Sequence, residues 1–217
     1  MQRPTRKIPF SPPDISEAEI QEVTETLRSG WITTGPRTKQ LERELAGWIG
    51  TEKCVCLSSQ TACAEMALRL LGIGKDDEVI VPAYTYTASA SVIDHVGAKI
   101  VMIDSQPDNL EMDYDAMEAA ITERMKAIIP VDLGGVPCDY ARIFEIVERK
   151  RDLFQPSNEI QRAIGRIAVC ADAAHALGAT WHGQIIGGIA DFSSFSFHAV
   201  KNFTTAEGSR RPSGLRK

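Results

Sequence analysis

Apolar residues recur along the chain at two spacings, one typical of helices and one typical of buried strands. In the first fifty residues the helical spacing prevails: residues 16–19 have a capping-box sequence, and apolar residues follow every three or four positions until Gly30. A second apolar stripe at this spacing predicts a helix over 38–49, which Gly50 ends. The residues between the two helices, 31–36, are predicted to form an ordered loop.

From residue 53 onward, short apolar runs rich in β-branched residues alternate with amphipathic segments. Such alternation is typical of right-handed βαβ units, and it predicts an α/β fold with a mostly parallel sheet and helices on both faces. Residues 152–166 interrupt the alternation and are predicted to form a surface insertion. The predicted strands cover 53–57, 78–81, 99–104, 127–131, 167–171 and 192–196, and the predicted helices cover 61–71, 87–96, 114–122 and 140–150.

Composition and charge narrow the class of protein. The 217 residues are 43% hydrophobic and 24% charged, which is enough to bury the core of one domain. The 24 Lys and Arg against 29 Asp and Glu give a net charge of −5, so the chain lacks a broad basic surface for nucleic acid or an anionic membrane. No apolar run reaches the roughly 18 residues of a spanning helix, and the first residues lack the apolar part of a secretory signal. We therefore expect a cytoplasmic protein with no nucleic-acid or membrane partner.

The five cysteines show no CxxC spacing, and most of them lie in or beside apolar segments. We expect small buried thiols rather than disulfides. Cys54 and Cys56 alternate within a predicted strand, so their side chains point to opposite sides of the sheet and cannot join Cys63 in one metal site. The sequence therefore predicts no metal ligands.

Polar and aromatic residues follow the predicted strands, at the edge of the sheet where α/β proteins bind ligands. A hydroxyl-rich turn with Ser59, Thr61 and Ala62 opens the helix after the first strand. The N–H groups and the positive dipole end of a helix bind anions such as phosphate, so these residues are candidates for an anion site. Serine and threonine are also ordinary helix N-caps, and the sequence leaves both interpretations open.

Two charged residues at this edge, Asp172 and Lys201, follow apolar segments. A carboxylate at the end of the apolar run 167–171 is costly without a positive partner or a strong donor. A protonated heterocycle nitrogen would serve Asp172, and so would a helix cap or a nearby arginine. Lys201 follows the apolar segment 192–198, where burial can lower the pKa of an amine and make it a nucleophile. A solvated loop lysine is the alternative.

Five segments of the chain together resemble one family of enzymes. Residues 172–176 (DAAHA) and 195–202 (FSFHAVKN) are the most specific, and 30–36 (GWITTGP), 74–82 (GKDDEVIVP) and 127–131 (AIIPV) accompany them. The combination resembles the DegT/DnrJ/EryC1/StrS family of pyridoxal-phosphate (PLP)-dependent sugar aminotransferases, whose fold is type I of the PLP-dependent transferases. The resemblance covers nearly the whole chain.

The resemblance implies a role for each candidate residue. Lys201 corresponds to the lysine that binds the cofactor aldehyde as a Schiff base and then moves the substrate proton. Asp172 corresponds to the acid that pairs with the pyridinium nitrogen. Tyr86 corresponds to the aromatic residue that stacks on the ring, and His175 to the residue that contacts the ring face or its phenolic oxygen. Thr61, Ala62 and Ser196 correspond to the phosphate-binding positions, and Ser59 is a further cofactor-binding candidate at the start of the same helix. Gln60 stands where a small residue is common in the family, and it is assigned no role.

The implied reaction transfers an amino group from an amino acid, with glutamate or glutamine as the expected donor, to the keto group of a nucleotide-linked sugar. Such chemistry belongs to polysaccharide or amino-sugar biosynthesis, and the motifs favour UDP- or dTDP-linked 4-keto-6-deoxy sugars. The resemblance also implies a homodimer. A related dehydratase branch has histidine in place of the lysine, so Lys201 argues against that branch.

The C-terminal residues depart from the family pattern. Family members are longer, and residues 209–217 contain four basic residues in nine without an apolar pattern. We therefore expect an N-terminal helical segment (1–50), an incomplete PLP-binding large domain (51–208) and an aberrant basic tail (209–217). On this interpretation the chain is truncated and lacks the C-terminal small domain. Its sheet would lack the last strand and expose an unpaired edge, and it would capture PLP weakly with little or no turnover.

Two other classes of protein compete with this interpretation. A non-catalytic or regulatory remnant of the PLP fold is the alternative function, because the truncation favours it while Lys201 and Asp172 favour catalysis. A Rossmann nucleotide-binding domain would carry GxGxxG after the first strand, and residues 58–63 (SSQTAC) do not have this motif. The Rossmann class is therefore not expected.

Overall fold

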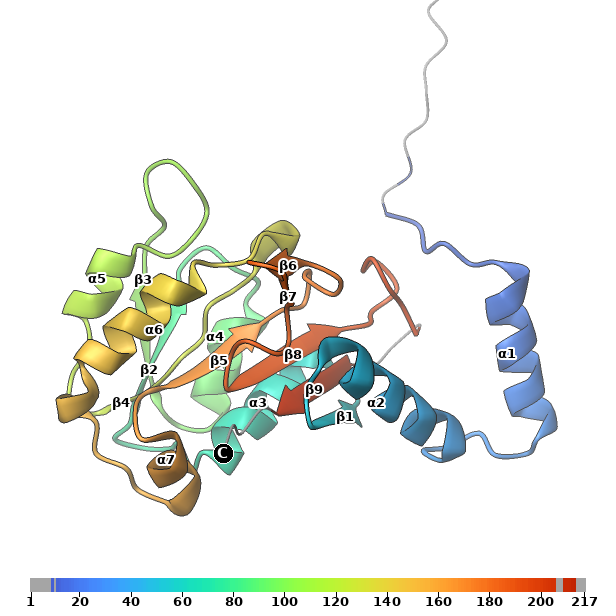
Figure 1. Ribbon diagram of the computed structural model, residues 1–217, viewed down its shortest axis with the longest axis horizontal. Helices are drawn as coiled ribbons and strands as arrows, with labels where there is room; N and C mark the ends of the chain where they lie inside the picture. Colours follow the sequence, from blue (N-terminus) through green and yellow to red (C-terminus); the bar gives the residue numbers. More distant parts are fainter. Residues whose placement is uncertain (1–8, 10, 206–208, 214–217) are drawn as a thin grey trace, which may run out of the picture.

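A mostly parallel sheet forms the centre of the computed structural model, which describes residues 9, 11–205 and 209–213. Its strands are β1 (Lys53–Leu57), β2 (Glu78–Pro82), β3 (Lys99–Ile103), β4 (Met125–Ile128), β5 (Ala168–Asp172), β8 (Phe192–Ser196) and β9 (Ser209–Ser213). Within the described residues their order is β1-β9-β8-β5-β4-β2-β3 (Figure 1). The pairs β2/β3, β2/β4, β4/β5 and β5/β8 are parallel, and β9 is antiparallel to both of its neighbours.

Helices cover both faces of this sheet. The α-helices of the described residues are α1 (Glu17–Arg28), α2 (Pro36–Ile49), α3 (Gln60–Leu70), α4 (Ala88–His95), α5 (Tyr114–Ala119), α6 (Tyr140–Arg149) and α7 (Glu159–Ile164). Because side chains alternate sides along a strand, Ile80 and Val169 pack in one core with residues of α2, α5 and α6. Val79, Val81 and Ala168 pack in a second core with α3 and α4. Helix α1 buries no residue and lies apart from the sheet (Figure 1).

The predicted α/β class is confirmed, with a mostly parallel sheet and helices on both faces. All six predicted strands are present, and β1 and β8 have the predicted bounds. Strand β4, predicted over 127–131, ends at Ile128, two residues before Pro130, which has no N–H to donate to a ladder. The capping box of α1 is present, since Ser16 and Glu19 exchange hydrogen bonds with each other's backbone. No helix among the described residues is both long and apolar enough to cross a membrane.

The segment 152–166, predicted as a surface insertion, is partly exposed, and Phe154 and Gln161 within it are buried. It contains α7, whose N-cap Asn158 donates through Nδ2 to the carbonyl of Leu71 at 2.6 Å. The buried Gln161 donates to the same carbonyl at 2.7 Å. These two amides satisfy the end of α3, a contact between residues about 90 positions apart that periodicity does not reveal. The short hairpin of β6 (Thr180–Trp181) and β7 (Gln184–Ile185) was likewise too short for a periodic pattern.

Strand β9 occupies a position in the sheet that the sequence analysis expected to be empty. It lies between β1 and β8, with Val55 opposite Arg211 and Ser196 opposite Ser209. A ladder uses backbone N–H and C=O groups, which every residue except proline supplies, so the absence of an apolar pattern did not prevent pairing. Within the described residues the expectation of an unpaired edge beside β8 is therefore wrong. The assignment of 209–217 to a separate tail stays a prediction.

None of the five cysteines, all of them among the described residues, is in a disulfide, as predicted. Four of them are buried, and Cys56 is half-buried. Cys54 and Cys138 pack in one core and Cys170 in the other, as small apolar side chains do.

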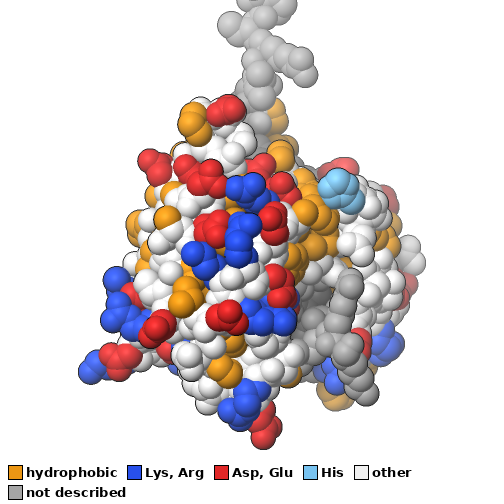
Figure 2. Space-filling model, turned by 60° about the vertical axis from the view of Figure 1, so that its left-hand side comes forward, with side chains coloured by type: hydrophobic (Ala, Val, Ile, Leu, Met, Phe, Trp, Pro, Cys, Tyr) orange, Lys and Arg blue, Asp and Glu red, His pale blue; other side chains and the backbone are white. Residues whose placement is uncertain are grey.

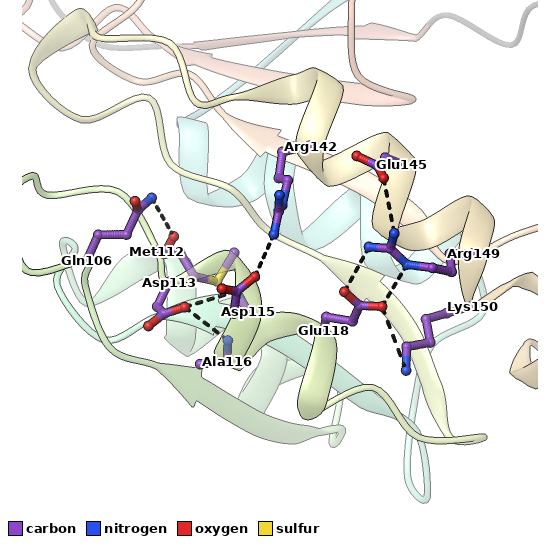
Figure 3. A network of polar contacts seen from close by, with 10 residues as sticks. All are labelled: Gln106, Met112, Asp113, Asp115, Ala116, Glu118, Arg142, Glu145, Arg149 and Lys150. Atoms are coloured by element: carbon purple, nitrogen blue, oxygen red, sulfur yellow. Dashed lines mark hydrogen bonds and ion pairs between the residues drawn. The ribbon is translucent and has the colours of Figure 1, made fainter.

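Helices α5 and α6 are joined across the surface by ion pairs (Figure 3). Arg142 reaches Asp115 at 2.5 Å, and Arg149 pairs with Glu118 at 2.8 Å. Figure 2, which turns this side of the molecule forward, shows basic and acidic side chains interspersed. Exposed pairs of this kind each contribute little to stability. This face is therefore solvated and of mixed charge, without a basic patch.

Candidate active site

A pocket of about 820 Å³ opens where the predicted polar residues follow the strands. Parallel strands bring their carboxyl ends to the same edge of the sheet, which is why segments far apart in the sequence meet here. Seven of the eight predicted site residues line the pocket, namely Ser59, Thr61, Tyr86, Asp172, His175, Ser196 and Lys201. Ala62 is not among the lining residues, and its N–H donates to the Ser59 hydroxyl at 3.0 Å.

Helix α3 presents its first turn to this pocket. Ser59 is the N-cap, as one of the two open interpretations predicted, and Ser59 and Thr61 also line the pocket. Gln60 is buried and donates to the Ser194 hydroxyl at 2.9 Å, and Ser194 donates to the carbonyl of Ala171 at 3.2 Å. The start of α3 is thus tied to β8 and β5. The positive end of the helix dipole and Ser196 together suit a phosphate group.

Asp172 lies at the inner end of the pocket, with 5% of its surface exposed. Its Oδ2 accepts from the Ser89 hydroxyl at 2.7 Å, and its Oδ1 accepts from the N–H of Ala174 at 3.1 Å. Burial raises the pKa of this carboxyl above its usual range, although both hydrogen bonds act to lower it. Asp172 forms no ion pair within the described part of the chain. A cationic group in the pocket would therefore offset the cost of its buried charge.

Lys201 lies in the segment after β8, half-buried at the wall of the pocket. Its backbone N–H donates to the carbonyl of His198 at 2.9 Å. Burial lowers the pKa of the Lys201 amine, and the charge of Asp172 opposes that shift. A lowered pKa increases the fraction of neutral amine, which is the nucleophilic form. Of the two interpretations left open by the sequence, the structure favours the desolvated lysine.

His175 and Tyr86 occupy the rim. His175 accepts at Nδ1 from the N–H of Gly134 at 3.2 Å. Burial, together with the charge of Lys201, lowers the pKa of this imidazole. Tyr86 lines the pocket and is 77% exposed, so its side chain is accessible to a ligand there.

Sequence reasoning missed three contributors to this site. Ser89, in α4, holds Asp172 although the two residues are 83 positions apart. Gly134 holds His175, and Gln60 anchors α3. The available signal was weak in each case: a serine at the second position of a helix, a glycine pair after a strand, and an unusual residue at a helix start.

The fold and the site define the class of protein. The fold is that of the PLP-dependent transferases of fold type I. The chain belongs to the DegT/DnrJ/EryC1/StrS aminotransferase family, whose model matches residues 13–209.

The chain is similar in sequence or structure to several named proteins. The spore coat polysaccharide biosynthesis protein SpsC of Bacillus subtilis is 40% identical over 208 residues, which are 96% of this chain and 50% of SpsC. The UDP-4-amino-4-deoxy-L-arabinose–oxoglutarate aminotransferase of Shewanella sediminis is 42% identical over 201 residues, 93% of this chain and 48% of that protein. The PLP form of the "Putative sugar aminotransferase Spr1654" of Streptococcus pneumoniae superposes with a TM-score of 0.95 at 62% identity, over 96% of this chain and 53% of that chain. The chain thus spans about half the length of the curated relatives it matches.

Proposed function

We propose that this chain forms the cofactor-binding part of a PLP-dependent sugar aminotransferase. The observation that carries the proposal is the meeting of Lys201 and Asp172 in one pocket at the carboxyl ends of β5 and β8. A half-buried amine and a buried carboxylate with neutral partners suit a group that has an aldehyde and a basic ring nitrogen. PLP bound there would supply an electron sink for negative charge that develops beside the amino nitrogen.

Lys201 and Asp172 carry the chemistry in this proposal. The neutral amine of Lys201 would hold PLP through its aldehyde, and as a free amine it would move a proton to and from the substrate. The carboxylate of Asp172 accepts a hydrogen bond from the protonated ring nitrogen and keeps that proton in place. Ser89 and the N–H of Ala174 fix the orientation of the carboxylate.

The remaining site residues bind and orient in this proposal. Tyr86 stacks on the ring and His175 contacts its edge. The N-terminal turn of α3 receives the phosphate group, with Ser59, Thr61, Ala62 and Ser196 as the phosphate-binding positions.

Family membership supports the wider proposal on substrates. The amino acceptor is a keto sugar linked to a nucleotide, and the donor is an amino acid, with glutamate as the expected one. The names of the Bacillus and Shewanella relatives support a place in polysaccharide or amino-sugar biosynthesis. The proposed location is the cytoplasm.

A second copy of the chain is the proposed protein partner. Ile20, Val23 and Leu27 are exposed along one side of α1, at helical spacing. An apolar stripe of this kind supports association with another copy. Sedimentation of the purified chain tests the homodimer.

The test of the cofactor site is covalent capture. The purified chain is mixed with PLP, reduced with borohydride, digested and analysed by mass spectrometry. We expect one pyridoxyl adduct, on Lys201, which is absent from Lys201→Ala and unchanged in the control Lys75→Arg, where an exposed lysine is replaced. Adducts scattered over surface lysines, or none, would contradict the proposed function and favour a non-catalytic remnant.

A further inference from the structure

The turn after β4 reaches across the pocket to His175. It is a short 3-10 turn, η1 (Leu133–Gly135), in which Gly134 and Gly135 have φ values of 64° and 82°. The N–H of Gly134 lies 3.2 Å from Nδ1 of His175. A backbone N–H is a donor and has no acceptor capacity, so Nδ1 must accept. In this contact the imidazole therefore has no proton on Nδ1.

The consequence is a fixed protonation pattern for the ring. A neutral imidazole carries one proton, and with Nδ1 accepting, that proton is on Nε2. A second proton would have to sit on Nδ1 and would break the bond to Gly134. The charged groups that face the ring are Asp172 and Lys201, which act in opposite directions, while burial lowers the pKa of His175. Contact geometry and environment thus both favour the neutral ring with Nε2–H.

Asp132 holds the turn in this position. Its side chain is buried, with 1% of the residue exposed, and it accepts from the N–H of Cys138 at 3.0 Å and from the Tyr140 hydroxyl at 2.9 Å. Its backbone N–H donates to the carbonyl of Asp172 at 3.0 Å. The two ends of the loop that contains Gly134 are therefore tied together, and the loop is tied to the strand that carries Asp172.

We propose that the η1 turn, held by Asp132, is the positioning element that fixes His175 as the neutral Nε2–H tautomer and so makes Nε2 a hydrogen-bond donor in the pocket. The inference rests on the proposed function for the identity of the acceptor. An oxygen on the edge of the cofactor ring can accept a hydrogen bond from Nε2–H, whereas a protonated ring nitrogen cannot. The resemblance allows His175 to contact either the ring face or the phenolic oxygen, and an Nε2–H donor favours the phenolic oxygen. Asp132 and Gly134 act through His175 and touch no reacting atom.

Gly135 offers a selective way to move the turn. A Cβ added there would lie 3.0 Å from the carbonyl oxygen of His175, so the turn or the histidine segment must shift by a few tenths of an ångström. Gly183, in the loop between β6 and β7, is the matched control: its φ is 80°, and a Cβ there meets nothing within 4 Å. Gly135→Ala and Gly183→Ala thus introduce the same backbone strain, and the Gly135 change alone presses on His175.

The test is 15N NMR of the histidine-labelled chain without cofactor, with the His175 signals assigned by their loss in His175→Gln. We expect His175 near neutral pH to show an accepting Nδ1 and a protonated Nε2, unchanged in Gly183→Ala and replaced by mixed tautomers in Gly135→Ala. If Gly135→Ala does not fold, Tyr140→Phe, which removes one donor to Asp132, is expected to give the same mixing. A wild-type His175 with its proton on Nδ1, a doubly protonated ring, or an unaltered tautomer in the variants would overturn the proposal. Because no PLP is present, this result is independent of whether the borohydride experiment succeeds.

Discussion

Two buried carboxylates lie at opposite ends of the sheet, and their surroundings differ. Glu78 begins β2 and has 1% of its surface exposed. It accepts from Lys99 at 3.0 Å, from Arg124 at 2.6 Å and from the Thr122 hydroxyl at 2.5 Å. Asp172 ends β5 and accepts only from a serine hydroxyl and a backbone N–H among the described residues.

The difference indicates that the charge of Glu78 is structural and that the charge of Asp172 serves to bind a ligand. The cations and the hydroxyl around Glu78 outweigh its burial and hold the pKa of that carboxyl at about 2. Burial outweighs the two neutral donors of Asp172 and raises its pKa. Glu78 therefore stabilises the folded chain by itself, whereas the charge of Asp172 is compensated only when a cation enters the pocket.

The largest expected effect is on cofactor binding by Asp172→Ala. Removing one partner of a buried charge pair costs on the order of 3 kcal/mol, which corresponds to a loss of affinity of about 100-fold. Titration of the chain with PLP, followed by its visible absorption, measures the change. Equal PLP affinity in wild type and Asp172→Ala would contradict the claim that Asp172, unlike Glu78, binds a cationic group of the ligand.

Glu78→Gln is expected to lower the stability of the chain and to leave PLP affinity unchanged. It exchanges a carboxylate for an amide that cannot attract Lys99 and Arg124, and losing charged hydrogen bonds of this type costs about 2 kcal/mol of unfolding free energy. PLP affinity should not change, because Glu78 lies at the other end of the sheet. Urea denaturation and the PLP titration, run on the same preparation, check both halves of the prediction. A weakened affinity at full stability would reverse the assignment.

The two carboxylates also predict opposite pH dependences. Glu78 has a folded-state pKa of about 2 against an ordinary value near 4.5, so its contribution is complete above that value and is lost as the pH falls toward 2. The pKa of Asp172 is raised, so its charged form costs stability as the pH rises above its ordinary value. Glu78→Gln should therefore flatten the acid limb of stability against pH, and Asp172→Asn should raise stability at neutral pH. Denaturation series at several pH values measure both slopes, and parallel curves for the two variants would contradict the account.

The smallest effect is expected on the solvated face. Arg142→Ala breaks the exposed pair with Asp115 (Figure 3) and should lower the unfolding free energy by less than about 0.5 kcal/mol. It should leave PLP affinity unchanged, and added salt should erase the remaining difference. A loss of unfolding free energy as large as that of Glu78→Gln would show that exposed and buried ion pairs contribute equally to stability.

The parts of the molecule that could be predicted from the sequence are those whose own segment carries a recognisable pattern. Strands β1 (KCVCL) and β8 (FSSFS) have the predicted bounds. Asp172 and Lys201 were found because a charge after an apolar run is conspicuous. The partners of these residues were not found, since Ser89 and Gly134 reach them from distant segments and carry no local pattern. Strand β9 was missed for a related reason, because its pairing depends on backbone groups rather than on side-chain types.

The account's central claim is that Asp172 keeps a proton on the ring nitrogen of a cofactor held by Lys201. The most direct measurement is the 15N NMR signal of PLP labelled at the ring nitrogen and bound to the chain, compared with Asp172→Asn and with Glu78→Gln. We predict a protonated ring nitrogen at neutral pH in the wild type and in Glu78→Gln, and an unprotonated one in Asp172→Asn. An unprotonated nitrogen in the wild type, or a proton that survives in Asp172→Asn, would contradict the claim.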